Sequence, residues 1–375
     1  MSAFLVAPYL ATYLVSDIGV TPVVAGSVIG LSYWFLRASG LSAAFFLRWL
    51  SVKQLMLVGS ALRAIGYLPL LSSNFTLIII GLAAIGVGAG LYFPLSKAYP
   101  NAIVPDDSQL KALSWRNVYA NIGVALGPVL GLALLSLSSA TLIFTAAAIF
   151  AVVSVLLLFL PHISLARETE HRGLRIYVRV ALTRRTSSVL VASFVLGGVF
   201  IQLESLFPLW AKENSVEALI AIVFTANAVL VVAGQGLGVL IVTRTTPRWS
   251  FFIGGTTAVI GLLLFGPTNP AWLFWIMGIT VLTIGEVVLG LTNDNLIREF
   301  KGDEQVAAYG IAGLMDATGG LAGAALGAAL FAGWHSGSGQ VVPFIPIAAG
   351  AGILVLVAFA IAPHKTTTEI TTAHD

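Results

Sequence analysis

Five ionisable side chains fall inside long apolar stretches of the sequence, and their types and positions allow chemistry there: Arg37, Arg63, Glu204, Glu286 and Asp316. A charge near the centre of a bilayer costs at least about 2.5 kcal/mol, so each of these residues is a candidate for a functional site. A carboxylate in an apolar wall can take up and release a proton near neutral pH, or hold a cationic substrate. A guanidinium can neutralise such a carboxylate or bind an anion. We therefore expect proton handling and small-molecule binding at these residues.

The composition indicates that lipid is the main solvent of the chain. Of the 375 residues, 58% are hydrophobic and only 9% are charged, whereas a soluble domain carries about 25% charged residues. The absence of cysteine excludes disulfide frameworks, Cys-based metal sites and thiol nucleophiles. The five histidines fall in predicted loops or tails, and no nucleotide-binding P-loop is present. We expect no enzyme, no metal site, no cofactor and no ATP-driven transport by this chain.

Twelve apolar stretches are long enough to cross a bilayer as helices, which requires about 20 residues each. Turn residues separate them, as at Asp17-Ile18-Gly19 and Pro105-Asp106-Asp107. The first stretch is short and starts at Met1 without the features of a secretory signal peptide, and a truncated start is expected there. The sequence predicts an all-helical membrane protein with spans at 2–16, 22–46, 54–72, 75–99, 112–136, 139–161, 187–211, 217–243, 249–266, 269–296, 306–332 and 343–362.

One long polar stretch divides these spans into two groups of six. The expected organisation is an N-terminal six-helix bundle at 1–161, a central cytoplasmic linker at 162–186, a C-terminal six-helix bundle at 187–362 and a cytoplasmic tail at 363–375.

Basic residues report the orientation of the chain. Lys and Arg concentrate in cytoplasmic loops. With both termini cytoplasmic, all of the 19 basic residues fall on that side except Lys212, which lies outside, and Arg37 and Arg63, which lie within spans. Topology thus explains the positive charge without nucleic-acid binding. We expect a monomeric, multi-pass protein of the plasma membrane.

The two groups of spans carry an internal repeat. An offset of 196 residues superposes five glycines of the first half on glycines of the second, for example Gly59 on Gly255 and Gly127 on Gly323. The same offset places Arg48 on Arg244 and the fifth span on the eleventh. Parallel repeats related by an axis along the membrane normal occur in secondary transporters.

A glycine motif in the fifth predicted span carries a resemblance to a known family. The run Gly123-Val124-Ala125-Leu126-Gly127-Pro128-Val129-Leu130-Gly131 resembles the antiporter motif of the major facilitator superfamily, Gly-x-x-x-Gly-Pro-x-x-Gly-Gly, with Leu132 in place of the last glycine. Glycines four residues apart allow close approach of a neighbouring helix, which is also the alternative, purely structural explanation, and Pro128 permits a bend. Together with the twelve spans in parallel halves, the motif makes the chain similar to the 12-span drug/proton antiporters of this superfamily over essentially its whole length.

The loop after the second span departs from the superfamily pattern. Alignment on Gly59 puts Arg48 where that pattern has an acidic residue, and Lys53 follows it. The resemblance implies a cytoplasmic gate at this loop, formed here by Arg48 and Lys53.

Four of the ionisable residues are predicted to share one depth. At a rise of about 1.5 Å per residue, Arg37, Arg63, Glu286 and Asp316 lie roughly 13–17 Å from the cytoplasmic ends of their spans. The cations are in the first half and the anions in the second. Since the second and eleventh spans are neighbours in the superfamily fold, the resemblance implies that Arg37 pairs with Asp316. Such a pair either opens when Asp316 is protonated or permanently neutralises a buried charge.

The remaining candidates keep two interpretations each. Glu286 is the first candidate for proton coupling, or else a structural hydrogen-bond acceptor. Glu204 is a second proton or substrate site, or a solvated residue at an outer vestibule. Arg63 contacts substrate or is structural. Tyr33 and Trp34 lie within one turn of Arg37, and they are the aromatic residues that we expect to line a cavity.

These observations together predict secondary active transport. The first hypothesis is proton-coupled efflux of small amphipathic or cationic compounds by alternating access, as in multidrug resistance, with proton and substrate competing for Glu286 and Asp316. The alternative is a proton-coupled importer of a sugar, nucleoside or organic anion, in which Arg37 and Arg63 bind the substrate. A receptor that uses the same fold without transport is a further alternative.

Overall fold

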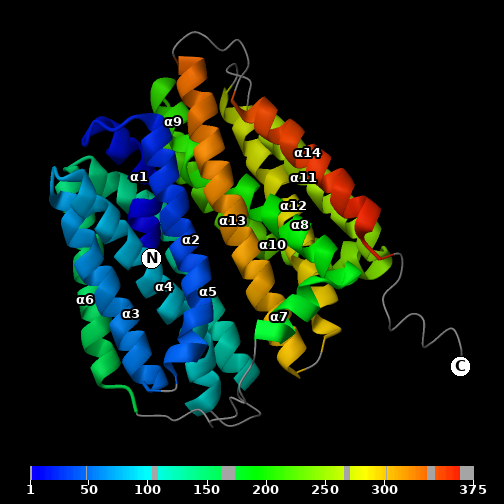
Figure 1. Ribbon diagram of the computed structural model, residues 1–375. Helices are drawn as coiled ribbons and strands as arrows, with labels where there is room; N and C mark the ends of the chain where they lie inside the picture. Colours follow the sequence, from blue (N-terminus) through cyan, green and yellow to red (C-terminus); the bar gives the residue numbers. More distant parts are fainter. Residues whose placement is uncertain are drawn as a thin grey trace, which may run out of the picture. The chain divides into compact units, whose positions relative to one another are not determined.

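The computed structural model describes residues 2–47, 49–103, 109–161, 174–265, 271–300, 302–335 and 343–363, and every element assigned within these ranges is helical (Figure 1). The all-helical fold class predicted from the sequence is therefore confirmed. Helix bounds follow the predicted spans closely because the ends of the apolar runs coincide with turn residues.

The first six predicted spans correspond to helices in the same order. A short 3-10 helix, η1 (Leu68–Leu71), continues the third of them. The helices are α1 (Ser2–Ser16), α2 (Pro22–Phe46), α3 (Val52–Tyr67), α4 (Phe75–Ile103), α5 (Gln109–Leu135) and α6 (Ser139–Leu158).

The second half contains two features that the predicted spans lack. A short helix, α7 (Leu174–Ala181), lies within the predicted linker, and the seventh span is divided between α8 (Arg184–Glu204) and α9 (Leu206–Glu213). The division falls at Ser205, because Pro208 has no backbone N–H for the carbonyl of Glu204. The other helices are α10 (Ala218–Arg244), α11 (Pro247–Leu264), α12 (Ala271–Arg298), α13 (Gly302–His335) and α14 (Phe344–Ile361).

Within the described residues, nine helical segments are long and apolar enough to cross a membrane. Three shorter apolar helices, at Ala3–Ser16, Pro22–Ala38 and Ile122–Leu135, fall where the first, second and fifth spans are predicted. The chain is thus a multi-pass membrane protein, and the total of twelve spans stays a prediction.

The chain forms two compact units. Unit 1 comprises residues 1–168 and 204–225, and unit 2 comprises residues 169–203 and 226–375. Unit 1 therefore contains α1 to α6, Glu204, α9 and the first residues of α10. The predicted division into bundles at the 162–186 linker stays a prediction.

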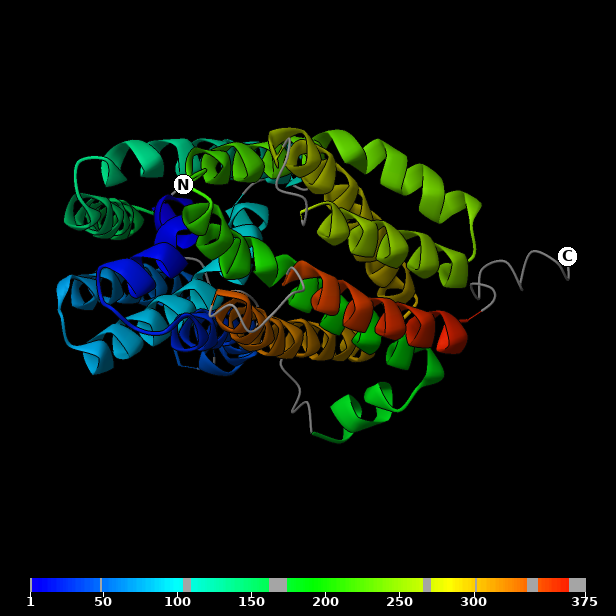
Figure 2. The same ribbon diagram turned by 90° about the horizontal axis from the view of Figure 1, so that it is seen from above.

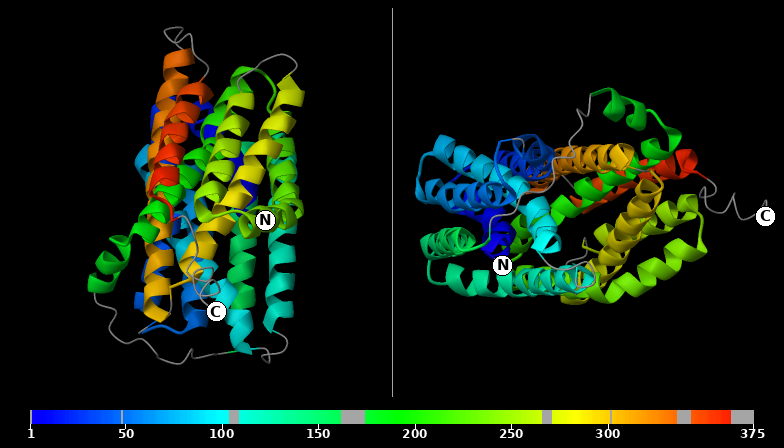
Figure 3. Two further views of the ribbon diagram at one scale, coloured as in Figure 1. Left: turned by 90° about the vertical axis from the view of Figure 1, so that its right-hand side faces the viewer. Right: turned by 90° about the horizontal axis from the view of Figure 1, so that it is seen from below.

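In unit 1, α3 packs between α4 and α6, and α2 packs on the other side of α4 (Figures 1 and 3). A buried cluster at one end joins α3, α4 and α6 through Val52, Leu55, Leu95, Tyr99 and Leu157. This arrangement gives α4 two close neighbours, α2 and α3.

In unit 2, α11 packs against both α12 and α14 (Figure 2). The short helix α7 packs on α13, where Val180 is buried and Arg179 forms an ion pair of 2.5 Å with Glu304 (Figure 1). The predicted linker therefore contains a segment fixed to unit 2.

Helix positions reproduce the offset of the sequence repeat. Pro22 begins α2 and Ala218 begins α10, while Phe75 begins α4 and Ala271 begins α12. The same offset separates contacting residues of α1 and α9, since the Thr12 hydroxyl lies 3.5 Å from the Pro208 carbonyl and Lys212 bonds to Ser16.

Candidate functional site

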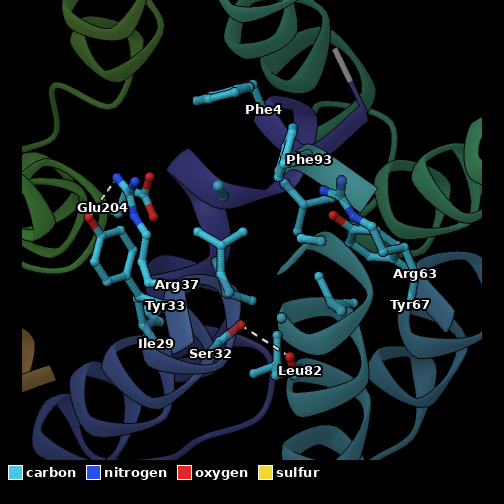
Figure 4. Close-up of a pocket in the computed structure, with 18 residues that line it drawn as sticks. Phe4, Ile29, Ser32, Tyr33, Arg37, Arg63, Tyr67, Leu82, Phe93 and Glu204 are labelled. Carbon is cyan, nitrogen blue, oxygen red and sulfur yellow. Dashed lines mark hydrogen bonds between the residues drawn. The ribbon is translucent and has the colours of Figure 1, made fainter. Parts of the chain in front are cut away.

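A cavity of about 240 Å³ lies within unit 1. Its walls come from α1, α2, α3 and α4, and Glu204 completes them (Figure 4). Most lining side chains are apolar, and the charged ones lie at two places on opposite sides of the cavity (Figure 4). Ser32 lies between these places, and its hydroxyl donates to the Leu82 carbonyl. The cavity therefore offers a mostly apolar middle between two charged ends.

The first polar end is formed by Arg37, Tyr33 and Glu204. The Arg37 guanidinium donates a hydrogen bond of 3.1 Å to the Tyr33 hydroxyl, and its carbon lies 5.2 Å from the centre of the Tyr33 ring. Arg37 is also the charged group that acts on the Glu204 carboxyl, which lies beside it (Figure 4). Arg37 is exposed and Glu204 is half-buried, so this end is the open one.

The second polar end is buried and centres on Arg63, whose side chain is 3% exposed. The Arg63 guanidinium carbon lies 4.0 Å from the centre of the Phe150 ring and 5.3 Å from that of Phe93. The Tyr67 hydroxyl is its polar neighbour. Arg63 Nε has no hydrogen-bond partner among the described residues. A guanidinium thus sits deep in the cavity, held by aromatic rings.

Glycines of α4 bring the helices that line the cavity close together. A Cβ added to Gly86 would lie 2.6 Å from the Ser32 carbonyl oxygen of α2, and a Cβ added to Gly59 of α3 would lie 2.6 Å from the Gly88 carbonyl oxygen. Gly88 also adjoins the side chain of Arg63. The run Gly86-Val87-Gly88 therefore serves helix packing, with one glycine facing α2 and the other facing α3.

The antiporter-like motif packs against α1. A Cβ at Gly127 would lie 2.6 Å from Phe4 Cβ, and a Cβ at Gly131 would overlap the Leu5 carbonyl oxygen. The Tyr9 hydroxyl donates a hydrogen bond of 2.6 Å to the Pro128 carbonyl. Gly123, the first glycine of the motif, is buried. The motif thus holds α1 against α5, and α1 supplies one wall of the cavity.

Glu286 and Asp316 both belong to unit 2. Asn227 of α10 donates hydrogen bonds of 3.2 Å to Glu286 Oε2 and 2.9 Å to Thr283 Oγ1 of α12. Asp316 is 7% exposed, and its backbone lies at a close crossing of α13 with Gly197 of α8. The predicted pairing of Arg37 with Asp316 joins residues of different units and stays a prediction.

Other predicted site residues have different surroundings. The Trp34 ring packs edge-on against Phe35 at 5.7 Å, and the cavity is lined by Tyr33 rather than by Trp34. Lys53 Nζ donates hydrogen bonds of 2.7 Å and 2.6 Å to the carbonyls of Leu158 and Leu160, at the end of α6. Arg48 lies outside the described residues. Two polar lining residues, Tyr67 and Ser32, are not among the predicted site residues, although Tyr67 follows Arg63 by one helical turn.

Residues 1–293 match the family described as the Major Facilitator Superfamily. The chain belongs to the major facilitator superfamily. It is 28% identical over 298 residues to the uncharacterized MFS-type transporter YqjV of Bacillus subtilis, an alignment that covers 75% of this chain and 71% of that protein. It is 24% identical over 277 residues to the Na(+), Li(+), K(+)/H(+) antiporter of Planococcus maritimus, which covers 66% of this chain and 65% of that protein.

A solved structure shares the fold of this major facilitator protein. The POT family transporter PepTSo superposes with a TM-score of 0.78 at 13% identity, over 96% of this chain and 94% of that one. The expectation of a transporter is confirmed, since the family and the relatives are transporters and not enzymes. A small-molecule substrate and a membrane setting follow from the family.

Proposed function

We propose that the chain is a proton-coupled secondary transporter, which moves small amphipathic organic compounds by alternating access and uses Glu204 as a proton site. The observation that carries the proposal is the position of Glu204 beside Arg37 at the open end of an otherwise apolar cavity. Protonation of Glu204 removes the negative partner of Arg37, so the proton changes the charge and the hydrogen bonding of the site.

Two forms of coupling are supported by different observations. Exchange of substrate for protons, and hence efflux, is supported by the motif of Gly127, Pro128 and Gly131 and by the naming of one relative as a cation/proton antiporter. Co-transport of an organic anion with protons is supported by the two arginines of the cavity, because their positive charges can bind the anion. Glu286 and Asp316 are the carboxylates at which a proton and a cationic substrate would compete.

The purified protein in liposomes with a pH-sensitive dye inside tests this proposal. Phenylpropanesulfonate, phenylpropanol and phenylpropyltrimethylammonium share one skeleton and differ in charge, and each is added outside without a pH gradient. Internal acidification indicates co-transport with protons, and internal alkalinisation indicates exchange. We expect at least one such amphipathic compound to move protons faster than in protein-free liposomes. Proton movement equal to that control for every amphipathic compound screened contradicts the proposal.

A further inference from the structure

We infer that Arg63 forms a subsite for the anionic group of an amphipathic monoanion, such as a carboxylate or a sulfonate, and that Arg37 with Glu204 is a separate, proton-sensitive end of the same cavity. The inference rests on the proposed function, since it names the substrate class of that cavity. The two arginines therefore have different tasks.

The first reason is an unsatisfied donor on a buried cation. Arg63 is 3% exposed, and its Nε has no hydrogen-bond partner among the described residues. The neighbours of its guanidinium among the described residues include the rings of Phe93 and Phe150 and the hydroxyls of Tyr67 and Tyr92, and none of these groups is a carboxylate. A buried charge is costly without a paired counter-charge. An anion that accepts the Nε hydrogen supplies one.

The second reason is the charge of the whole cavity. Arg37 and Arg63 contribute two positive charges to its lining, and Glu204 contributes one negative charge when it is ionised. Arg37 is the cation that acts on Glu204, and Glu204 also acts on Tyr67 beside Arg63, so one positive charge of the lining is left over. A monoanion at Arg63 makes the cavity neutral, whereas a cationic compound adds to the excess.

The third reason is the form of the walls. Figure 4 shows Arg63, Tyr67 and Phe93 on one side of the pocket and Arg37, Tyr33 and Glu204 on the other. Leu82 lies between the two ends, and Ile29 lies beside Tyr33. A ligand with a charged head and an apolar body fits these walls, with its head at Arg63 and its body along the middle of the cavity.

The inference fixes the sign of the coupling. A proton on Glu204 raises the positive charge of the cavity, so proton and monoanion favour the same state of the site. Of the two forms of coupling considered above, the subsite therefore predicts co-transport.

Binding measured by calorimetry on the full chain in lipid nanodiscs tests the subsite without any need for transport. Wild-type protein is expected to bind phenylpropanesulfonate at least about tenfold more tightly than phenylpropanol, because hydrogen bonds to charged groups are the strong ones. Arg63→Gln is expected to remove this preference. Arg244→Gln, a change at an exposed residue of α10, is the matched control and keeps the preference.

Arg63→Lys keeps the positive charge but lacks Nε, so it should retain only part of the preference. If Arg63→Gln does not fold, Arg63→Lys tests the subsite alone. A ratio of sulfonate affinity to alcohol affinity equal to that of the wild type then overturns the subsite. Equal affinities of the wild type for both compounds, or a preference that survives Arg63→Gln, also overturn it. Proton movement without a sulfonate preference rejects the subsite alone, whereas a sulfonate preference without proton movement rejects only the proposed function.

Discussion

The guanidinium of Arg37 lies beside the carboxyl of Glu204 at the open end of the unit 1 cavity. Arg37 belongs to α2, and Glu204 is the last residue of α8, directly before the helix break at Ser205. The break ends α8 at the cavity, so Glu204 is placed there by a local feature of the chain. A change of charge at Glu204 therefore acts at a point where one helix ends and the next begins.

Replacement of Arg37 tests the electrostatic link to Glu204. The positive charge of Arg37 favours the ionised carboxylate, so Arg37→Gln should let Glu204 hold its proton at higher pH. The pH at half-maximal transport is therefore expected to rise. The pH profile of substrate-driven proton movement in liposomes measures this shift.

Arg298→Gln removes a charge at an exposed residue of α12 and is the control. Its pH profile should equal that of the wild type. An unchanged or lowered midpoint in Arg37→Gln would show that Arg37 does not act on the coupling carboxylate.

The close packing of α5 on α1 gives a prediction about stability. Gly131→Ala places a methyl group against the Leu5 carbonyl oxygen, and overpacking of this kind costs about 1–3 kcal/mol. The midpoint of thermal unfolding in detergent should fall accordingly. Gly236→Ala makes the same change in α10, where a Cβ meets nothing within 4 Å, so it should hold or raise the midpoint. Equal effects of the two changes would contradict the packing role of the motif.

Lys53 is expected to stabilise the end of α6. Its Nζ donates to the carbonyls of Leu158 and Leu160, and the final carbonyls of a helix have no partner within the helix. Lys53→Met should lower the free energy of unfolding by about 1 kcal/mol. Thermal unfolding measures the loss, and Lys53→Arg is the control that keeps a donor. A Lys53→Met protein of normal stability and altered transport would favour the gate role that the sequence predicts for Lys53.

Glu286 tests whether unit 2 also takes part in proton coupling. Glu286→Gln keeps an acceptor for the Asn227 side chain, so the local hydrogen bonds and the stability should persist. Loss of the ionisable group should reduce substrate-driven proton movement to the level of protein-free liposomes. Glu217→Gln, a change just before α10, is the control. Normal proton movement in Glu286→Gln would leave Glu286 with the structural role alone.

The sequence predicts the helices well because their ends carry strong local signals. The second predicted span, 22–46, has the same bounds as α2, since Pro22 stands in its first turn and the apolar run ends at Phe46. The eight residues of α7 are too few and too charged for a membrane span, but their amphipathic pattern fits a helix that packs on α13. The break at Ser205 depends on Pro208, whose effect inside an apolar run is hard to foresee.

The site was harder to predict because apolar runs do not show which face of a helix points inward. Arg63 lies in a helix that packs on both sides, so its position in a cavity depends on the close crossing at Gly59 and Gly88. The position of Glu204 in the cavity depends on the helix break at Ser205 that follows it. By contrast, the spacing of Tyr33 to Arg37 indicates that the two side chains meet, because residues four apart share a helix face, and the structure contains their hydrogen bond.

The most direct test of the proposed coupling is substrate-driven proton movement by Glu204→Gln in liposomes, with Glu213→Gln, an exposed change at the end of α9, as its control. A compound that moves protons with the wild type is added to both variants, and calorimetry confirms that each still binds it. We predict that Glu213→Gln matches the wild type and that Glu204→Gln moves no more protons than protein-free liposomes. Wild-type proton movement by Glu204→Gln would contradict the assignment of Glu204 as the proton site.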